Sequence, residues 1–163
     1  EDIKGINIDF NEKNHICLNS KDIESKIRTP KYSKLASKFS ALSFIREYLG
    51  DIQKSLVKNK GYVADGRDIG TSIIPHAEVK IYLTASIEAR AKRRLNDYRQ
   101  AGIDTTYEEV YEHIVERDEQ DSNREHSPLQ IPEDAKIIDN TNLSVDDQVK
   151  EISKLIDEKI PSS

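Results

Sequence analysis

The sequence Asp65-Gly66-Arg67-Asp68-Ile69-Gly70-Thr71 places three charged side chains within four residues, directly after the apolar run Tyr62-Val63-Ala64. The apolar run predicts a short buried strand, and the charged residues indicate a loop that begins where this strand ends. In an open α/β sheet, ligands bind in the crevice beyond the carboxyl ends of the strands. The charged side chains of this loop are therefore candidate binding groups.

Two further strands are predicted after the loop, at residues 77–85 and 135–138, because both segments are rich in β-branched residues. Helices are expected between and after these strands, with start or stop signals at Ser86, Gly102, Thr106 and Ser144. Strands that alternate with helices indicate parallel strands joined by crossovers. The predicted fold class is therefore α/β, with residues 61–163 forming part of a parallel core.

Residues 1–60 follow a different pattern. Alternating apolar residues from Ile6 to Phe10, followed by the run at 15–18, predict a β-hairpin, and residues 19–22 read as a turn. Thr29-Pro30 predicts a helix start, and an apolar stripe with helical spacing then extends from residue 35 to residue 56, with a possible break at 40–43. We interpret this part as a β-rich and helical insertion beside the sheet.

Composition narrows the class of protein. A chain of 163 residues is about one domain in size, and its net charge of −5 argues against a surface for nucleic acid. One cysteine, Cys17, excludes an internal disulfide and fits a cytoplasmic protein, and no apolar stretch reaches the ~20 residues of a membrane helix. Four scattered histidines give no metal-ligand spacing. The start, Glu1-Asp2-Ile3-Lys4, lacks a methionine, so we expect the chain to begin inside a longer gene product.

Arginines cluster on the predicted helices. Arg90, Arg93 and Arg94 share one helical face, which is either a phosphate-binding face or a solvated face relieved by Glu88. Arg117, Asp121 and Arg124 also share a face, as an anion site or as a surface ion pair. With Arg46 on the helical stripe and Arg67 on the loop, this inventory suits a transferring phosphoryl group, because guanidinium forks grip phosphate bidentately.

The two aspartates of the loop have different candidate roles. Asp68 could accept a hydrogen bond from an exocyclic amine such as that of cytosine. Asp65, at the end of the predicted strand, could orient water on Mg²⁺.

Five ordered motifs resemble those of the bacterial cytidylate kinases, in the family's order and spacing over nearly all of the chain. They are Ile27-Arg28-Thr29, then Ala36-Ser37 with Ile45-Arg46-Glu47, then residues 64–71, then Arg90-Ala91-Lys92-Arg93-Arg94, and finally Glu116-Arg117-Asp118 continuing through Asp121 to Arg124. The resemblance implies a nucleoside monophosphate kinase core with a parallel sheet, a phosphate-binding P-loop, a helical lid at about 88–103, and a β-rich NMP-binding subdomain within residues 1–60.

The resemblance also implies roles for individual residues. Recognition of the cytosine ring would fall to Ser37, Arg46 and Asp68. The phosphate and ribose of CMP would be held by Arg67, Arg117, Arg124 and Asp121. The catalytic groups would be the lid residues Arg90, Arg93 and Arg94, together with Asp65 acting on Mg²⁺ through water. The implied reaction transfers the γ-phosphoryl group of ATP to CMP or dCMP, in a monomeric protein with small-molecule partners and no nucleic acid.

One part of the family pattern does not occur in these 163 residues. The glycines lie at 5, 50, 61, 66, 70 and 102, and they form no phosphate loop ending in Gly-Lys; the family's first strand is missing as well. We therefore expect a truncated kinase that is inactive alone and carries the CMP side of the site. The alternatives are a non-catalytic nucleotide-binding fragment and a kinase for another nucleoside monophosphate.

Overall fold

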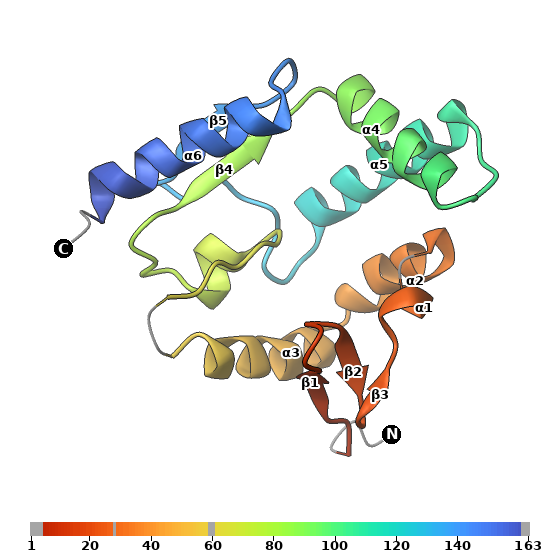
Figure 1. Ribbon diagram of the computed structural model, residues 1–163. Helices are drawn as coiled ribbons and strands as arrows, with labels where there is room; N and C mark the ends of the chain where they lie inside the picture. Colours follow the sequence, from red (N-terminus) through yellow and green to blue (C-terminus); the bar gives the residue numbers. More distant parts are fainter. Residues whose placement is uncertain (1–4, 28, 59–60, 161–163) are drawn as a thin grey trace. The chain divides into compact units, whose positions relative to one another are not determined.

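A computed structural model describes residues 5–27, 29–58 and 61–160 and divides the chain into two compact units, Glu1–Arg46 and Glu47–Ser163 (Figure 1). Arg28 of the first sequence motif and the predicted helix stop at Pro161 lie outside the described residues. The assignment of residues 1–60 to an NMP-binding portion stays a prediction.

The first unit contains the predicted hairpin, formed by β1 (Ile8–Phe10) and β2 (Ile16–Leu18), which pair antiparallel. A third short strand, β3 (Lys21–Asp22), pairs with β2, so the prediction of a turn over residues 19–22 was wrong in its second half. Asn19 and Ser20 both have positive φ, at 49° and 63°, and these two residues suffice to reverse the chain. Lys21 and Asp22 therefore lie beside β2 and pair with it.

Three helices follow the strands: α1 (Glu24–Ile27), α2 (Pro30–Ser40) and α3 (Ser43–Leu56). The predicted helix start is confirmed, since the Thr29 side chain accepts a hydrogen bond from the backbone of Tyr32 and Pro30 is the first helical residue. The predicted break is also confirmed, because the stripe is divided between Ser40 and Ser43. Cys17 is buried, and this burial raises the pKa of its thiol.

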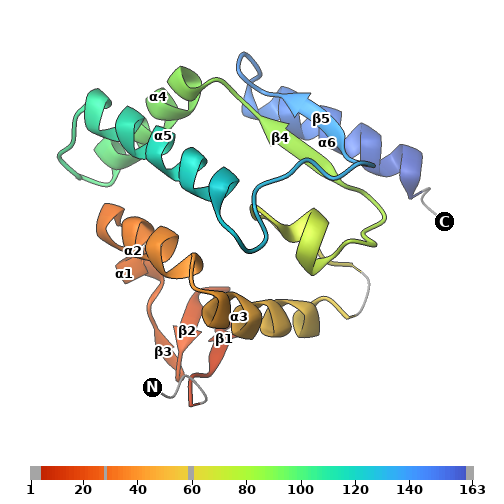
Figure 2. The same cartoon turned by 180° about the vertical axis from the view of Figure 1, so that it is seen from behind.

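The second unit is built on a parallel pair of strands, as predicted. Its elements are β4 (Ile81–Thr84), α4 (Ile87–Gln100), α5 (Tyr107–Asn123), β5 (Lys136–Asp139) and α6 (Val145–Lys159). Strands β4 and β5 run in register from Ile81 opposite Lys136 to Thr84 opposite Asp139. Figures 1 and 2 show α6 running alongside this pair. The fold is a mixed α/β arrangement consistent with the predicted class.

The predicted caps of this unit are confirmed. Ser86 and Ser144 accept hydrogen bonds from the first turns of α4 and α6, and Thr106 forms a reciprocal capping box with Glu109. Gly102 ends α4 with φ at +69°, a conformation that L side chains rarely adopt. Helices α4 and α5 bury a small core between them, composed of Ala91, Leu95, Tyr98 and Val110.

The predicted strand at residues 62–64 does not form. Tyr62 and Val63 are 57% and 96% exposed, and the segment has no regular secondary structure. An apolar run becomes a strand only when a neighbouring strand accepts and donates its backbone hydrogen bonds, and in the described residues β4 pairs with β5. The loop that follows contains a π-helical turn, η1 (Ile69–Ile73), which the sequence pattern did not indicate.

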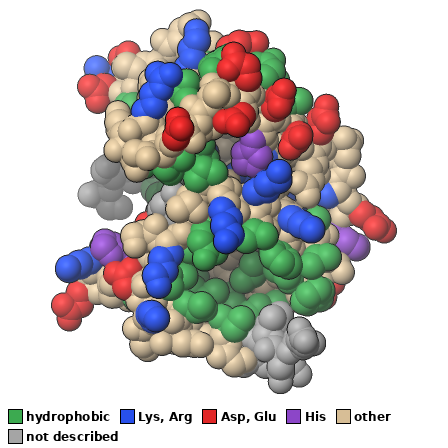
Figure 3. Space-filling view, turned by 90° about the vertical axis from the view of Figure 1, so that its right-hand side faces the viewer, with side chains coloured by type: hydrophobic (Ala, Val, Ile, Leu, Met, Phe, Trp, Pro, Cys, Tyr) green, Lys and Arg blue, Asp and Glu red, His purple; other side chains and the backbone are tan. Residues whose placement is uncertain are grey.

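Hydrophobic side chains remain at the surface beside basic and acidic ones (Figure 3). Phe10 and Phe44 of the first unit are 61% and 54% exposed, and Val145 of the second is 77% exposed. Within the described part of the chain, no helix has both the length and the hydropathy needed to cross a bilayer.

Asn140 joins three elements of the second unit. Its backbone N–H donates to the Thr84 carbonyl at 2.8 Å, its amide nitrogen donates to Gln148 at 2.5 Å, and its amide oxygen accepts from Arg93 at 3.0 Å. The residue is 7% exposed, so these groups are largely shielded from bulk water.

Replacing Asn140 with alanine is expected to lower the free energy of unfolding by about 1–3 kcal/mol, because buried hydrogen-bonding partners lose their acceptor and donor. Urea denaturation of the variant measures this loss. Asn142→Ala, at an exposed position nearby, is the control and should change stability by less than about 0.5 kcal/mol. Equal stability of the two variants would contradict the structural role of Asn140.

Candidate functional site

Seven charged side chains of the second unit meet in one place, which we call the arginine–aspartate cluster. They come from the loop before η1, from α4, from α5 and from the residue that ends α5. The members are Arg67, Asp68, Arg90, Arg117, Asp118, Asp121 and Arg124. Six of these seven were candidate site residues from the sequence; Asp118 is the addition.

Asp121 lies at the centre of the cluster, with its side chain 5% exposed. Its Oδ2 lies 3.4 Å from Nε of Arg67 and 3.7 Å from Nε of Arg117. Its Oδ1 lies 3.3 Å from Nη1 of Arg124. One buried carboxylate therefore holds three guanidinium groups, and the predicted alternative of a simple surface ion pair does not describe it.

The two contacts of Oδ2, with Arg67 and Arg117, are ion pairs without a hydrogen bond. Oδ2 of Asp121 and Nε of Arg117 are both buried and make no hydrogen bond with any described residue, although they lie within ion-pair distance of each other. The ion pair holds nonetheless, because opposite charges at this distance in a buried site attract without ideal donor geometry. The Arg117 Nε–H keeps the capacity to donate to a further acceptor.

Asp118 lies on the same side of α5 as Asp121, since residues three apart share a helical face. Its Oδ2 lies 2.6 Å from Nη1 of Arg90, and its Oδ1 lies 3.5 Å from Nη1 of Arg67. Arg90 is also anchored by its Nε, which donates to the Ala85 carbonyl at 3.1 Å. The sequence placed Asp118 within a motif without giving it a role; its spacing from Asp121 was the available signal.

Asp68 joins the cluster through Arg124. Its Oδ1 lies 3.7 Å from Nη2 of Arg124, whose Nε donates to the Ser127 carbonyl at 2.6 Å. The side chains of Asp68 and Arg124 are only 12% and 6% exposed. The turn η1, which begins directly after Asp68, fixes the backbone at this end of the cluster.

The cluster carries more positive than negative charge, since four arginines face three aspartates. Burial, and secondly the Arg67 guanidinium, lower the pKa of Arg117, while Asp121 acts in the opposite direction. Arginine stays protonated at neutral pH despite such a shift. A group in which guanidiniums outnumber carboxylates favours the binding of an anion.

The three arginines of α4 contact different partners. Arg90 contacts Asp118, whereas Arg93 donates to the side-chain and backbone oxygens of Asn140 at 3.0 and 2.6 Å. Arg94 is exposed, and its guanidinium lies 5.9 Å from the centroid of the Tyr98 ring. The shared face predicted from their spacing therefore resolves into three separate contacts.

The remaining sequence candidates are Asp65, Ser37 and Arg46. Asp65 is exposed, in the irregular segment before the loop. Ser37, which is 8% exposed, and Arg46, whose Nη1 donates to the Ser40 carbonyl at 3.2 Å, belong to the first unit. Their proximity to Asp68 stays a prediction. In the described residues, no three His, Cys, Asp or Glu side chains are arranged to hold a metal ion.

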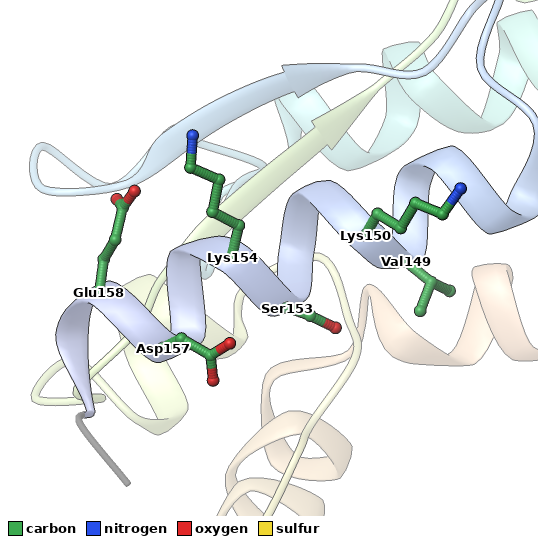
Figure 4. A pocket seen from close by; sticks show the side chains of 6 residues that line it. All are labelled: Val149, Lys150, Ser153, Lys154, Asp157 and Glu158. Carbon is green, nitrogen blue, oxygen red and sulfur yellow. The ribbon is translucent and has the colours of Figure 1, made fainter.

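A shallow hollow lies along α6 in Figure 4. It is lined by Val149, Lys150, Ser153, Lys154, Asp157 and Glu158. All six residues come from this one helix, and its two lysines are matched by two acids. It contains no predicted site residue and offers no excess charge to a phosphate, so the arginine–aspartate cluster is the candidate functional site.

The amino-acid sequence of the chain is similar to that of one family of known proteins. Residues 1–158 match the family model described as "Cytidylate kinase". Three proteins named cytidylate kinase are similar to this chain. Those from Thermotoga neapolitana, Thermosipho melanesiensis and Carboxydothermus hydrogenoformans are 40%, 45% and 45% identical to it in sequence. These matches cover 97%, 96% and 97% of this chain and 71%, 72% and 70% of the respective relatives.

Proposed function

The chain belongs to the cytidylate kinase family, and on that premise we propose that it serves to transfer the γ-phosphoryl group of ATP to CMP or dCMP, giving CDP or dCDP. The observation that carries this proposal is the arginine–aspartate cluster, whose net positive charge suits a phosphate monoester. We propose that these 163 residues supply the CMP-binding part of the catalytic site.

The phosphate of CMP would be held by the three arginines gathered around Asp121, which are Arg67, Arg117 and Arg124. Their planar forks match phosphate oxygens, and charge-assisted hydrogen bonds to such oxygens are about twice as strong as neutral ones. Asp121 would keep the guanidiniums in place before the nucleotide arrives. It would also accept hydrogen bonds from the ribose hydroxyls.

The cytosine base would be read by Asp68. A carboxylate accepts hydrogen bonds and cannot donate, so it suits the exocyclic amine of cytosine and disfavours the carbonyl that uracil has there. Because the side chain of Asp68 has low exposure, binding uracil would leave its carboxylate without a hydrogen bond from the base, which disfavours UMP. Ser37 and Arg46 would complete the recognition of the ring from the first unit.

ATP is the proposed phosphoryl donor, with Mg²⁺. The donor set agrees with this ion, since Mg²⁺ usually keeps several waters and binds through one or two carboxylates and the phosphates of its nucleotide. Asp65, an exposed carboxylate close to Arg67 in sequence, would hold one of those waters. Bound Mg²⁺ would neutralise charge on the phosphates, while the arginines of α4, in a lid at about residues 88–103, would stabilise the transferring group.

Two measurements test the proposed function. Calorimetry on the 163-residue chain with CMP, UMP, AMP and ATP should give the tightest binding with CMP. The chain extended by its own upstream coding sequence should convert CMP to CDP with ATP and Mg²⁺ in a coupled assay. Preferred binding of AMP would indicate a kinase for another monophosphate. CMP binding without transfer by the extended chain would indicate a non-catalytic binding module.

Asp68→Asn is expected to raise KM for CMP by about 10- to 100-fold while KM for ATP changes less than about threefold, because the lost hydrogen bond involves a charged acceptor proposed to face the base of CMP and not ATP. Steady-state kinetics with each substrate varied in turn measure the effect. UMP is the informative comparison, since an asparagine amide can donate to the uracil carbonyl. An equal rise of both KM values would remove Asp68 from base recognition.

A further inference from the structure

Asp118 connects two arginines that come from different parts of the fold. Arg67 lies on the loop before η1, Arg90 lies on α4, and Asp118 itself lies on α5. Its two carboxylate oxygens are divided between them, at 3.5 Å from Arg67 and 2.6 Å from Arg90. With its side chain 26% exposed, the carboxylate is shielded from most of the solvent.

The two arginines depend on this carboxylate to different degrees. Arg67 has a second acidic partner, since its Nε lies 3.4 Å from Asp121. Arg90 has an uncharged second partner, the Ala85 carbonyl. A neutral residue at position 118 would let Arg67 turn towards Asp121 and would leave the Nη groups of Arg90 without their short ion pair. The separation between the two guanidiniums would then no longer be fixed.

We propose that Asp118 is a positioning residue that sets the Arg90 guanidinium at a defined place relative to the Arg67 guanidinium. This proposal rests on the proposed function, in which Arg67 holds the phosphate of CMP and Arg90 stabilises the group in transfer. Placement of reacting groups to within about 1 Å decides rates by roughly 100-fold. A carboxylate shared by the two arginines meets this requirement.

A second effect of Asp118 has the opposite sign. As a negative charge near a phosphate site, it repels CMP, so its removal by itself would tighten CMP binding. Positioning predicts instead that its removal lowers kcat. The two effects are therefore separable in a single variant by comparing KM for CMP with kcat.

The experiment compares Asp118→Asn with Glu119→Gln, which removes an exposed negative charge one residue away. In the form of the protein that phosphorylates CMP, Asp118→Asn is expected to lower kcat by about 10- to 100-fold, with KM for CMP changed less than about threefold. Asp118→Glu, which retains the charge, should recover part of the rate. Glu119→Gln should leave kcat within about twofold of the parent.

The ion pair between Asp118 and Arg90 can also be followed directly, without substrate. In ¹⁵N NMR spectra of the 163-residue chain, the Nη groups of Arg90 should rotate slowly in the parent and in Glu119→Gln, and rapidly in Asp118→Asn. Unchanged Arg90 signals, or unchanged kcat with tighter CMP binding, would overturn the positioning role. A parent protein that phosphorylates no CMP would overturn the proposed function, while the NMR comparison would still decide whether Asp118 orients Arg90.

Discussion

Asp121→Ala is expected to lower the free energy of unfolding by about 3–5 kcal/mol, because it removes the central partner of a buried group of ion pairs and leaves two carboxylates for four cations. Three arginines contact this carboxylate, and the Arg124 side chain is as deeply buried as that of Asp121, at 6% against 5% exposed. For a domain whose whole stability is about 5–15 kcal/mol, this is a large fraction. Urea denaturation of the variant and the parent measures this loss of stability.

Phosphate should restore part of the lost stability. In the variant, four arginines face only two aspartates, so an inorganic phosphate ion replaces charge that the protein has lost. An ion that binds the folded state stabilises it in proportion to the logarithm of its concentration. The phosphate-dependent gain should therefore be greater in Asp121→Ala than in the parent.

The control for Asp121 is Asp104→Ala, at an exposed position between α4 and α5. It removes the same charge from the same unit and should change stability by less than about 0.5 kcal/mol. If phosphate stabilised the parent, the control and Asp121→Ala equally, the anion would be binding elsewhere. That outcome would disconnect the cluster from phosphate recognition.

Arg94→Ala is expected to lower kcat by about 100- to 1000-fold while KM for CMP changes less than about threefold, as for the loss of a donor that acts only in the transition state. Arg94 is exposed on α4, and its guanidinium lies over the Tyr98 ring at 5.9 Å. A cation–π contact at an exposed site contributes only about 0.5–1 kcal/mol. The guanidinium can therefore exchange the ring for a phosphoryl group at little cost.

Steady-state kinetics of the CMP-phosphorylating form measure this effect, with Arg99→Ala as the control. Arg99 is an exposed arginine in the last turn of the same helix, so its removal changes the net charge equally. Arg93→Ala is a poorer test, because it also breaks the contacts with Asn140. A rise in KM for CMP that exceeds the fall in kcat would place Arg94 in ground-state binding.

Local signals predicted most of the elements. The caps at Thr29, Ser86, Thr106 and Ser144 formed as expected, because a side chain that satisfies a first-turn N–H acts within four residues. The hairpin and the parallel character of β4 and β5 also followed from alternation and element order. The strand expected at residues 62–64 did not form, because a strand depends on a neighbouring strand to pair with and not only on local signals.

The cluster could be predicted only in part. The sequence supplied its six candidate members and the resemblance that grouped them, but it did not indicate that Asp118 bridges Arg67 and Arg90. The partners of Arg93 were likewise hidden, because Asn140 lies 47 residues further along the chain. Spacing along one helix predicts which side chains share a face, and it carries no information on what the opposite element presents.

The sequence by itself determined the helix caps, the α/β class, the motifs of the family and the arginines that share a helical face, because each depends on side chains close together in the chain or on their order. The tertiary structure decided which acid holds which arginine: Asp121 gathers three, Asp118 joins two, and Arg93 is held by an amide. Ion pairs act over a few ångströms between elements up to 56 residues apart, as for Asp68 and Arg124. Such pairs exist only once burial and packing have brought those elements together.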